Sequence, residues 1–447
     1  MTKSFGRAIR SAFVALRRGD VRAAASALGH AVSPQKPSQE PTRDPLPGRD
    51  SFAPAYRLKE FDRTYNKGTD GSVPGFAEAR ETKTWPERGQ MDASPLNVAT
   101  ALETKSGGPR RGGEPIRAAR ALHRIKHDDG SSSFYLPKEP GFYSGSFDCA
   151  AGARDYRLFI PTHKDRTVQG LIVMLHGCTQ SPEDLAAGTD MNALAETHGF
   201  IVVYPRQSES QNPMLCWNWY RAADQSRGVG EPGILAMLAD DIRREFSLPN
   251  TRVFAAGISA GGAMAAILSD AYPDLFAAVG IHSGIAPGAA RDLLGALAAM
   301  RGDHLTGINW RLQADSTHAP RVIVFQGEAD RVVHPSNARS IIGAARQFLP
   351  EGRLRTETGI SEDGRSYQKL TQSHPDGSSL VEAWLVDRLG HAWSGGRRGV
   401  SFTEQAGPAA SVEMVRFFQA TTASLEAEGP AAWLSGQVAE MPEARQM

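Results

Sequence analysis

The sequence predicts an α/β fold, in which a mainly parallel β-sheet is flanked by helices. From about residue 132, short β-rich runs alternate with helical stretches of about ten to fifteen residues, which is typical of β–α–β units. One run, Leu171–Leu175, is apolar without a break, as expected of a strand that helices cover on both faces.

The same alternation predicts the individual elements. Strands are expected at 156–160, 171–175, 200–204, 252–256, 277–281, 322–325 and 380–386. Helices are expected between them at 184–197, 232–246, 261–271, 289–300, 336–347 and 410–424. A hairpin is expected over about 354–376. Open parallel sheets bind ligands at the carboxyl ends of their strands, so functional side chains should follow strands directly.

The first 33 residues predict a short amphipathic helical leader. Apolar residues from Phe5 to Leu16 recur every three or four residues and share one helix face, and Asp20 caps a second helix after Gly19. Six basic residues and one acidic residue give this segment, 1–33, a charge of +5. Two interpretations stay open: a basic anchor on a membrane or granule surface, and a helix that docks on the main domain or on another copy.

Residues 34–131 are expected to form a flexible Pro/Gly-rich linker. Within 34–115, 20 of 82 residues are Pro or Gly, which is near the share at which disorder is the usual interpretation. No helical or strand period persists there. The folded domain is therefore expected at 132–424, followed by a flexible tail at 425–447.

The composition excludes several classes of protein. Fifty Lys and Arg residues against 49 Asp and Glu give a net charge of +1, which lacks the basic footprint of a nucleic-acid-binding protein. The apolar runs are far shorter than the roughly 20 residues that a membrane-spanning helix needs. Three cysteines without a Cys-x-x-Cys pair indicate neither a disulfide scaffold nor a zinc site.

A Gly-x-Ser-x-Gly motif supplies the candidate nucleophile. Ser259 lies between Gly257 and Gly261, after the strand expected at 252–256 and before the helix expected at 261–271. This context is that of a nucleophile elbow, in which larger side chains two positions from the serine would clash across the tight turn. A serine hydroxyl also needs a base and an acid that orients the base.

Later strand ends supply candidates for both. Asp330 is the expected acid because it lies just past the strand at 322–325, with Glu328 as the nearby competitor and Asp387 as a weaker one. His391 is the expected base because it follows the last strand of the domain. The order Ser, acid, His along the chain is that of α/β hydrolases.

Three other histidines are placed less favourably. His334 lies four residues past Asp330 and so does not sit on a separate loop. His282 precedes the acid in the sequence and is expected to be structural or to form a pocket wall. His374 falls within the expected hairpin.

Acyl transfer also needs two backbone N–H donors for the developing oxyanion. Ala260, directly after the nucleophile, is expected to supply one. The loop 176–180 is expected to supply the other, from Cys178 in preference to Thr179. His176 has no second ligand at zinc spacing and is expected to hold this loop, so no metal site is expected.

These motifs resemble the poly(3-hydroxybutyrate) depolymerase family of esterases, whose catalytic domain is similar to feruloyl and acetylxylan esterases. The resemblance covers about 145–420. It is carried by the segments 175–180 (LHGCTQ), 188–192 (GTDMN), 216–219 (CWNW), 230–232 (GEP), 257–264 (GISAGGAM), 272–274 (YPD), 282–284 (HSG) and 390–393 (GHAW). It implies an α/β-hydrolase fold at 132–424, a triad of Ser259, Asp330 and His391, and an oxyanion loop around Cys178.

Two features depart from the family, many of whose members are secreted and carry a polymer-binding domain after the catalytic one. The apolar stretch of the leader, Ala12–Leu16, is shorter than the seven or so residues that a secretion signal needs. No folded segment is expected after residue 425. The resemblance thus suggests an extracellular protein, and the absence of a conventional signal leaves a cytoplasmic one as the alternative. The leader resembles those of a subgroup of the family.

Aromatic residues and cysteines gather near the expected site. Trp217, Trp219 and Trp393, with Tyr220, are expected to line an apolar ester-binding cleft. Core packing is the alternative for one or two of them. Cys178 and Cys216 both lie in loops near the expected site, and the sequence leaves open whether they form a disulfide in an exported protein, with Cys149 then free.

The sequence thus predicts a serine esterase that works through an acyl-enzyme without a metal or organic cofactor. The expected substrate is a polyhydroxyalkanoate such as poly(3-hydroxybutyrate), or its oligomers. A carbohydrate ester of the feruloyl or acetylxylan type is the alternative. A function of another class is a surface-binding protein that coats polyester granules or membranes through residues 1–33. No nucleic-acid partner is expected, and the sequence does not indicate an oligomeric state.

Overall fold

The structure is a computed structural model that describes residues 136–162, 168–303, 321–347, 354–373 and 379–428. It also describes the backbone of two short paired strands, β1 (Arg124–Lys126) and β2 (Ser132–Phe134). The leader expected at 1–33, most of the linker expected at 34–131 and His374 lie outside the described residues.

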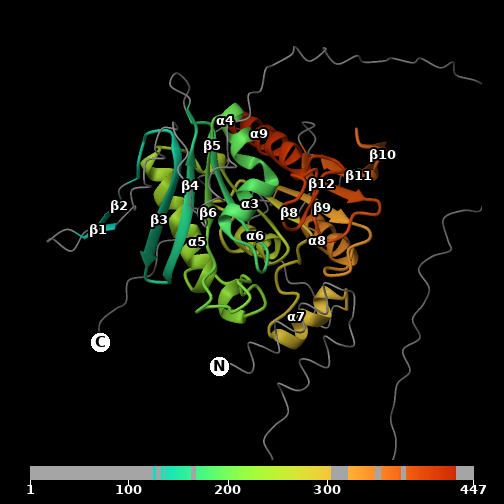
Figure 1. Ribbon diagram of the computed structural model, residues 1–447, viewed down its shortest axis with the longest axis horizontal. Helices are drawn as coiled ribbons and strands as arrows, with labels where there is room; N and C mark the ends of the chain where they lie inside the picture. The colour runs from blue at the N-terminus through green and yellow to red at the C-terminus, as the bar shows by residue number, and fades with distance from the viewer. Residues whose placement is uncertain are drawn as a thin grey trace, which may run out of the picture. The chain divides into compact units, whose positions relative to one another are not determined.

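A ten-stranded sheet forms the centre of the described region, in the order β10-β11-β12-β9-β8-β7-β5-β6-β4-β3 (Figure 1). Its strands are β3 (Gly141–Cys149), β4 (Gly152–Ile160), β5 (Gly170–Leu175), β6 (Phe200–Pro205), β7 (Val253–Ile258), β8 (Ala278–His282), β9 (Arg321–Gly327), β10 (Leu354–Ile360), β11 (Ser366–Ser373) and β12 (Ser379–Val386). The central strands β6, β5, β7, β8, β9 and β12 run parallel. The pairs β3–β4 and β10–β11 add antiparallel hairpins at the two edges. The sheet is therefore parallel at its centre, as predicted, and mixed as a whole.

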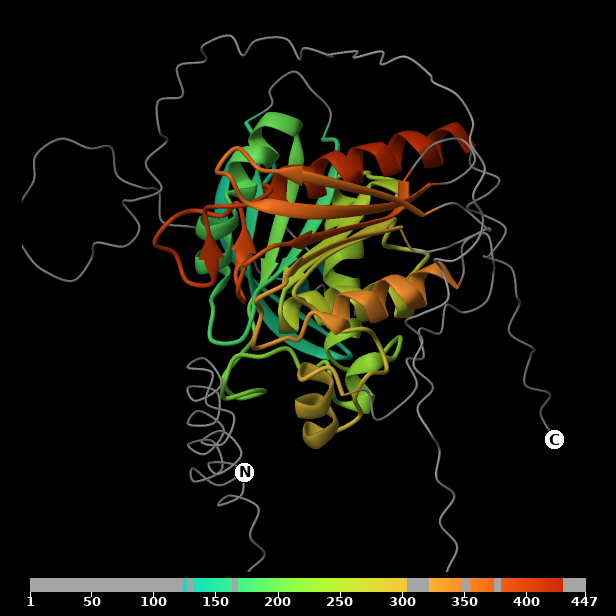
Figure 2. The same cartoon turned by 90° about the vertical axis from the view of Figure 1, so that its right-hand side faces the viewer.

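Helices cover both faces of this sheet, as α9 and α8 show in Figure 2. Residues of α3 (Pro182–Thr189), α4 (Met191–His198) and α9 (Ala410–Glu428) share one hydrophobic core. Residues of α5 (Gly230–Glu245), α6 (Ala260–Ala271) and α8 (Ser336–Arg346) share the other. In β5, Leu171 and Val173 belong to the second core, whereas Ile172 and Met174 belong to the first. This alternation explains why the strand is apolar at every position.

Smaller elements complete the described region. Helix α7 (Leu293–Met300) follows β8, and the short strands β13 (Trp393–Ser394) and β14 (Thr403–Glu404) pair after β12. Two 3-10 turns, η2 (Ala222–Gln225) and η3 (Asn250–Arg252), precede α5 and β7. None of the described helices is long and apolar enough to cross a membrane.

Several boundaries differ from the predicted ones. The helix predicted at 184–197 is two helices, because Asp190 takes a left-handed conformation (φ 56°) between α3 and α4, and Asp is among the few residues that tolerate it. Helix α9 runs to Glu428, four residues into the tail predicted at 425–447. Strand β1 lies inside the linker predicted at 34–131, and three residues are too few to establish a strand period.

Helix α6 approaches strands β5 and β7 so closely that glycine is required at the contact. A Cβ at Gly261 would press against the backbone carbonyl of Leu175, and one at Gly257 would press against the backbone of Gly261. The sheet register pairs Leu175 with Gly257. The two glycines therefore let α6 begin one residue after β7 ends, with Ser259 alone in the turn between them.

We expect Gly261→Ala to destabilise the fold by about 3 kcal/mol, because the new methyl group meets backbone that no side-chain rotation can move. Gly343 in α8 is the matched control: it is exposed, and a Cβ there would meet no atom within 4 Å. Gly343→Ala should stabilise the fold by about 0.5–1 kcal/mol. Urea denaturation of the two variants measures both effects, and a Gly261→Ala protein as stable as the wild type would contradict the packing described here.

Candidate active site

Ser259 occupies the sharp turn between β7 and α6. Its backbone has φ 58° and ψ −122°, a conformation that residues other than glycine rarely adopt and that concentrates at functional sites. Its N–H donates to the carbonyl of His282 at the end of β8 (2.9 Å). The serine is thus fixed at the carboxyl edge of the sheet, with its side chain at the start of α6.

Asp330 and His391 meet at the same edge of the sheet. Asp330 follows β9 and His391 follows β12, and His391 Nδ1 lies 2.7 Å from Asp330 Oδ2. Backbone hydrogen bonds tie the two loops together, from Glu328 N to Val386 O and from Ala329 N to Leu389 O (3.0 Å each). The acid and the base predicted on separate strands are therefore in direct contact.

The Asp330 carboxylate is buried and held by several donors. Its Oδ1 accepts from the N–H groups of Val332 (2.8 Å) and Val333 (2.9 Å), and its Oδ2 accepts from Gln326 Nε2 (3.3 Å). Burial acts to raise the pKa of Asp330, but the interaction with His391 and the two backbone N–H groups outweigh it, so the pKa is lowered. An ionised Asp330 accepts the Nδ1 proton of His391, which leaves His391 Nε2 able to take a proton.

The competing carboxylates do not share this contact. Glu328 is exposed on the same loop. Asp387 accepts from the guanidinium of Arg388 (3.0 Å). Of the three carboxylates considered from the sequence, Asp330 is the one that His391 contacts.

Ser259 and His391 line one narrow pocket. Its other lining residues are Gly177, Cys178, Gln180, Ile258 and Phe402, and its volume is about 10 Å³. That is roughly the space for one water molecule. The pocket joins the predicted nucleophile, the predicted base and the predicted oxyanion loop.

The backbone N–H groups around this pocket differ in their partners. The Thr179 N–H donates to Met214 O (2.8 Å) and is therefore committed to the fold. The N–H groups of Cys178 and Ala260 have no acceptor among the described residues. In this loop, therefore, the Cys178 N–H is available to an acceptor in the pocket and the Thr179 N–H is not.

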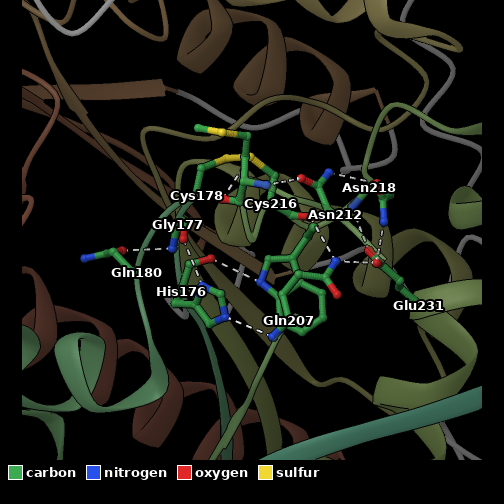
Figure 3. The surroundings of a disulfide bond; sticks show 11 residues. His176, Gly177, Cys178, Gln180, Gln207, Asn212, Cys216, Asn218 and Glu231 are labelled. Atoms are coloured by element: carbon green, nitrogen blue, oxygen red, sulfur yellow. Dashed lines mark hydrogen bonds between the residues drawn. A yellow bond between two sulfur atoms is a disulfide. The ribbon is translucent and has the colours of Figure 1, made fainter. Parts of the chain in front are cut away.

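A disulfide between Cys178 and Cys216 joins two loops beside the pocket (Figure 3). The two Cα atoms lie 4.2 Å apart, across a sequence separation of 38 residues. Among the described residues Cys149 is the free cysteine. The bond settles the pairing that the sequence left open, and it ties the Cys178 loop to the segment that begins at Cys216.

Two buried histidines next to the pocket are structural. His176 donates from Nδ1 to the Gly177 carbonyl (2.8 Å) and accepts at Nε2 from the Gln207 N–H (3.1 Å). His282 accepts at Nε2 from the Ser394 N–H (3.0 Å) and stacks on Trp393 (5.0 Å between ring centres). Both rings are therefore engaged in hydrogen bonds to backbone groups. The described residues contain no cluster of three or more His, Cys, Asp or Glu side chains that could hold a metal ion.

The three tryptophans predicted to line the cleft are buried in the core, which corrects that interpretation. Trp217 is 0% exposed, and its indole N–H donates to the His176 carbonyl (3.1 Å). Trp393 is 1% exposed and donates to Ser411 Oγ (3.0 Å). Trp219 is 6% exposed and packs edge-on against Tyr220. The apolar rings are used to pack the core, and none of them lines the pocket at Ser259.

Phe402 and Gln180 also line the pocket, and neither had an individual role predicted from the sequence. Phe402 packs edge-on against the His391 ring (6.1 Å between ring centres). Gln180 accepts from the Gly177 N–H (2.9 Å) and donates to the Ser401 carbonyl (3.1 Å), so it links the two sides of the pocket. Gln180 belongs to a motif quoted above and could have been assigned this role. Phe402 lies in no motif, and nothing in the sequence pattern marks it.

The strand order, the strained serine turn and the Asp330–His391 contact place the described domain in the α/β-hydrolase class of proteins. Residues 154–369, just under half of the chain, match the family model described as "Esterase PHB depolymerase". The match confirms the resemblance found in the sequence. It ends before His391, which is placed by the geometry alone.

Curated relatives of this chain carry several esterase names. "Poly(3-hydroxyalkanoate) depolymerase C" of Paucimonas lemoignei is 28% identical over 49% of this chain and 54% of its own length. "Probable acetylxylan esterase A" of Aspergillus clavatus is 30% identical over 38% of this chain and 58% of its own length. "Feruloyl esterase B" of Thermothelomyces thermophilus is 27% identical over 52% of this chain and 82% of its own length. The chain thus spans little more than half the length of the first two relatives.

The two buried histidines predict how stability depends on pH. Burial lowers the pKa of His176 to about 4 and that of His282 to about 3, from an ordinary value near 6.5. Between pH 6.5 and its lowered pKa, each histidine binds a proton in the unfolded chain but not in the folded one. The free energy of unfolding is therefore highest above about pH 6.5 and falls as the pH drops through this range. Each histidine should contribute a slope of about 1.4 kcal/mol per pH unit.

Urea denaturation between pH 6.5 and 5 measures this slope. His282→Gln keeps an acceptor for the Ser394 N–H and cannot titrate, so over this range its curve should be shallower than that of the wild type by about 1 kcal/mol per pH unit. Parallel curves for the two proteins would contradict the assignment of His282 as a buried neutral group.

Proposed function

We propose that the protein is a serine esterase that hydrolyses carboxylic esters through an acyl-enzyme. The observation that carries the proposal is the Asp330–His391 contact beside a pocket that Ser259 shares with His391. The strained conformation of Ser259 and the unpaired N–H groups of Cys178 and Ala260 support the same assignment. The esterase names of the relatives agree with it.

In the proposed reaction, His391 Nε2 takes the hydroxyl proton of Ser259 as the serine oxygen bonds to the ester carbonyl carbon. The N–H groups of Cys178 and Ala260 stabilise the negative oxygen of the tetrahedral intermediate. The ester C–O bond then breaks, and the leaving alcohol takes the proton from His391. Water repeats the sequence on the acyl-enzyme and releases the acid. Asp330 keeps the His391 ring in the productive tautomer throughout.

The proposed substrate is a short-chain polyhydroxyalkanoate, such as poly(3-hydroxybutyrate), or its oligomers. The relative from Paucimonas lemoignei supports this class by its name. The second candidate is a carbohydrate ester, which the names of the fungal relatives support.

Two other interpretations of the sequence are less well supported. If the protein acted only as a surface-binding protein through residues 1–33, the arrangement of Ser259, Asp330 and His391 would have no function. The ester-binding surface proposed here is the loop edge around Ser259, because the tryptophans considered for it are buried.

Variants of Ser259 and Asp330, with a control at Glu328, test the mechanism. Ser259→Ala should lower kcat by roughly 10⁴-fold or more, because the acyl-enzyme cannot form. Asp330→Asn should lower kcat by roughly 10⁴-fold, because the amide favours the wrong tautomer of His391. Glu328→Gln on the same loop is the matched control and should retain activity within about twofold, because it is exposed. Steady-state hydrolysis of a p-nitrophenyl ester measures all three, and equal losses in Asp330→Asn and Glu328→Gln would refute the choice of acid.

A substrate panel tests the substrate class. We expect the highest kcat/KM on amorphous poly(3-hydroxybutyrate) or its oligomers, and lower values on acetylxylan and on methyl ferulate. Acid release can be followed by titration at constant pH, with Ser259→Ala as the background. Hydrolysis of the two carbohydrate-type esters alone would replace the first candidate with the second.

A further inference from the structure

Glu231, in the first turn of α5, is a buried carboxylate that the proposed reaction does not use. It is 3% exposed. Its Oε1 accepts from Arg154 Nη2 (3.0 Å), from Asn218 Nδ2 (2.7 Å) and from Gln207 Nε2. Its Oε2 accepts from the Asn218 backbone N–H (2.6 Å). Four donors from three separate segments therefore converge on one carboxylate.

Burial of this kind is unfavourable for a charged group. Burial acts to raise the pKa of Glu231, and the Asn218 N–H, Gln207 and Arg154 oppose that effect. The Arg154–Glu231 ion pair is itself buried, with side-chain exposures of 5% and 3%. Buried ion pairs often contribute little net stability, because desolvation offsets their attraction. A role in fixing the positions of neighbouring groups would account for the arrangement better than stability does.

The first connection from Glu231 to the pocket runs through Gln207. The Gln207 side chain bridges Glu231 and the Cys216 carbonyl (2.9 Å). The Gln207 backbone N–H donates to His176 Nε2 (3.1 Å). His176 lies two residues before Cys178 and holds the Gly177 carbonyl through Nδ1 (2.8 Å). The carboxylate is thus linked to the start of the Cys178 loop.

The second connection runs through the Cys216–Asn218 segment (Figure 3). Glu231 holds the Asn218 backbone N–H and side chain. The neighbouring Trp217 donates its indole N–H to the His176 carbonyl (3.1 Å). Cys216 is bonded covalently to Cys178. Both connections therefore end at the loop that carries the Cys178 N–H.

We propose that Glu231 is a positioning residue, which holds the Cys178 N–H at the place where the oxyanion forms. This inference rests on the proposed function, because it assigns Glu231 a role in the same acyl transfer. Glu231 does not touch the reacting atoms. It acts on them through Gln207, Asn218 and the disulfide, and a small displacement of Cys178 should weaken binding of the transition state more than binding of the substrate.

Glu231→Gln tests the proposal. The new amide group would turn a donor toward at least one of the four donors that now converge there, so the Cys216–Asn218 segment should shift. We expect kcat to fall about 10- to 100-fold, less than the roughly 10²- to 10³-fold that accompanies complete loss of an oxyanion donor. KM should change by less than about threefold. The inhibition constant of a trifluoromethyl ketone, which forms an oxyanion on the serine, should rise in parallel with the loss of kcat/KM.

Glu382→Gln is the matched control. Glu382, on β12, is also a buried carboxylate (1% exposed) and pairs with Arg416 and with Lys369 (3.2 Å), but it has no link to the Cys178 loop. Its loss should lower stability and leave kcat, per titrated active site, within about twofold of the wild type. Equal losses of kcat in Glu382→Gln and Glu231→Gln would overturn the proposal, because a general loss of a buried charge would then explain both.

Gln207→Met is the second variant, and it carries the test if Glu231→Gln does not fold. It removes the bridge to Cys216 and leaves the Arg154–Glu231 pair in place. We expect a fall in kcat of at least about fivefold at nearly constant KM. Wild-type kcat in Gln207→Met, and in Glu231→Gln where it folds, would overturn the inference. Loss of activity in Ser259→Ala would still uphold the proposed function in that case, whereas a wild type that hydrolyses no ester would refute the function itself.

Discussion

The described structure depends on the register of its central parallel strands. Leu175 pairs with Gly257, Ile258 with His282, and His282 with Phe325, while Gly327 pairs with Val386. The strands β5, β7, β8, β9 and β12 therefore end within about three residues of one another along the strand direction. The loops that follow them begin side by side, which brings together residues that are far apart in the sequence. Without this register, Asp330 and His391 would not meet and neither would share an edge with Ser259.

Buried hydrogen bonds hold the polar groups around this edge in position. His176 and His282 are uncharged rings whose nitrogens bond to backbone groups of neighbouring loops. The Glu231 carboxylate likewise accepts hydrogen bonds from the backbone and side chain of Asn218, in the segment that the disulfide joins to the Cys178 loop. Each buried polar group is unfavourable unless its partners are all present. The geometry of the pocket and the integrity of the fold are therefore linked, and a change at one of these groups should affect both.

Much of this organisation could be predicted from the sequence, for identifiable reasons. Ser259, Asp330 and His391 each follow an apolar run directly, and a parallel sheet converts that pattern into proximity. The tryptophans could not be assigned in this way, because an aromatic ring near a motif fits a core or a cleft equally well. Only the contacts of their indole N–H groups decide it. The break at Asp190 depends on one backbone angle, and Phe402 reaches the pocket from a loop without any motif.

The Cys178–Cys216 bond has a consequence for how the chain matures. Three cysteines permit three different pairings, and only one of them joins the two loops beside the pocket. Cys149, at the end of β3, is a competitor during oxidative folding. A pairing that uses Cys149 would leave either Cys178 or Cys216 as a free thiol. Preparations of the protein can therefore contain chains of identical mass and composition that differ in the state of a single loop.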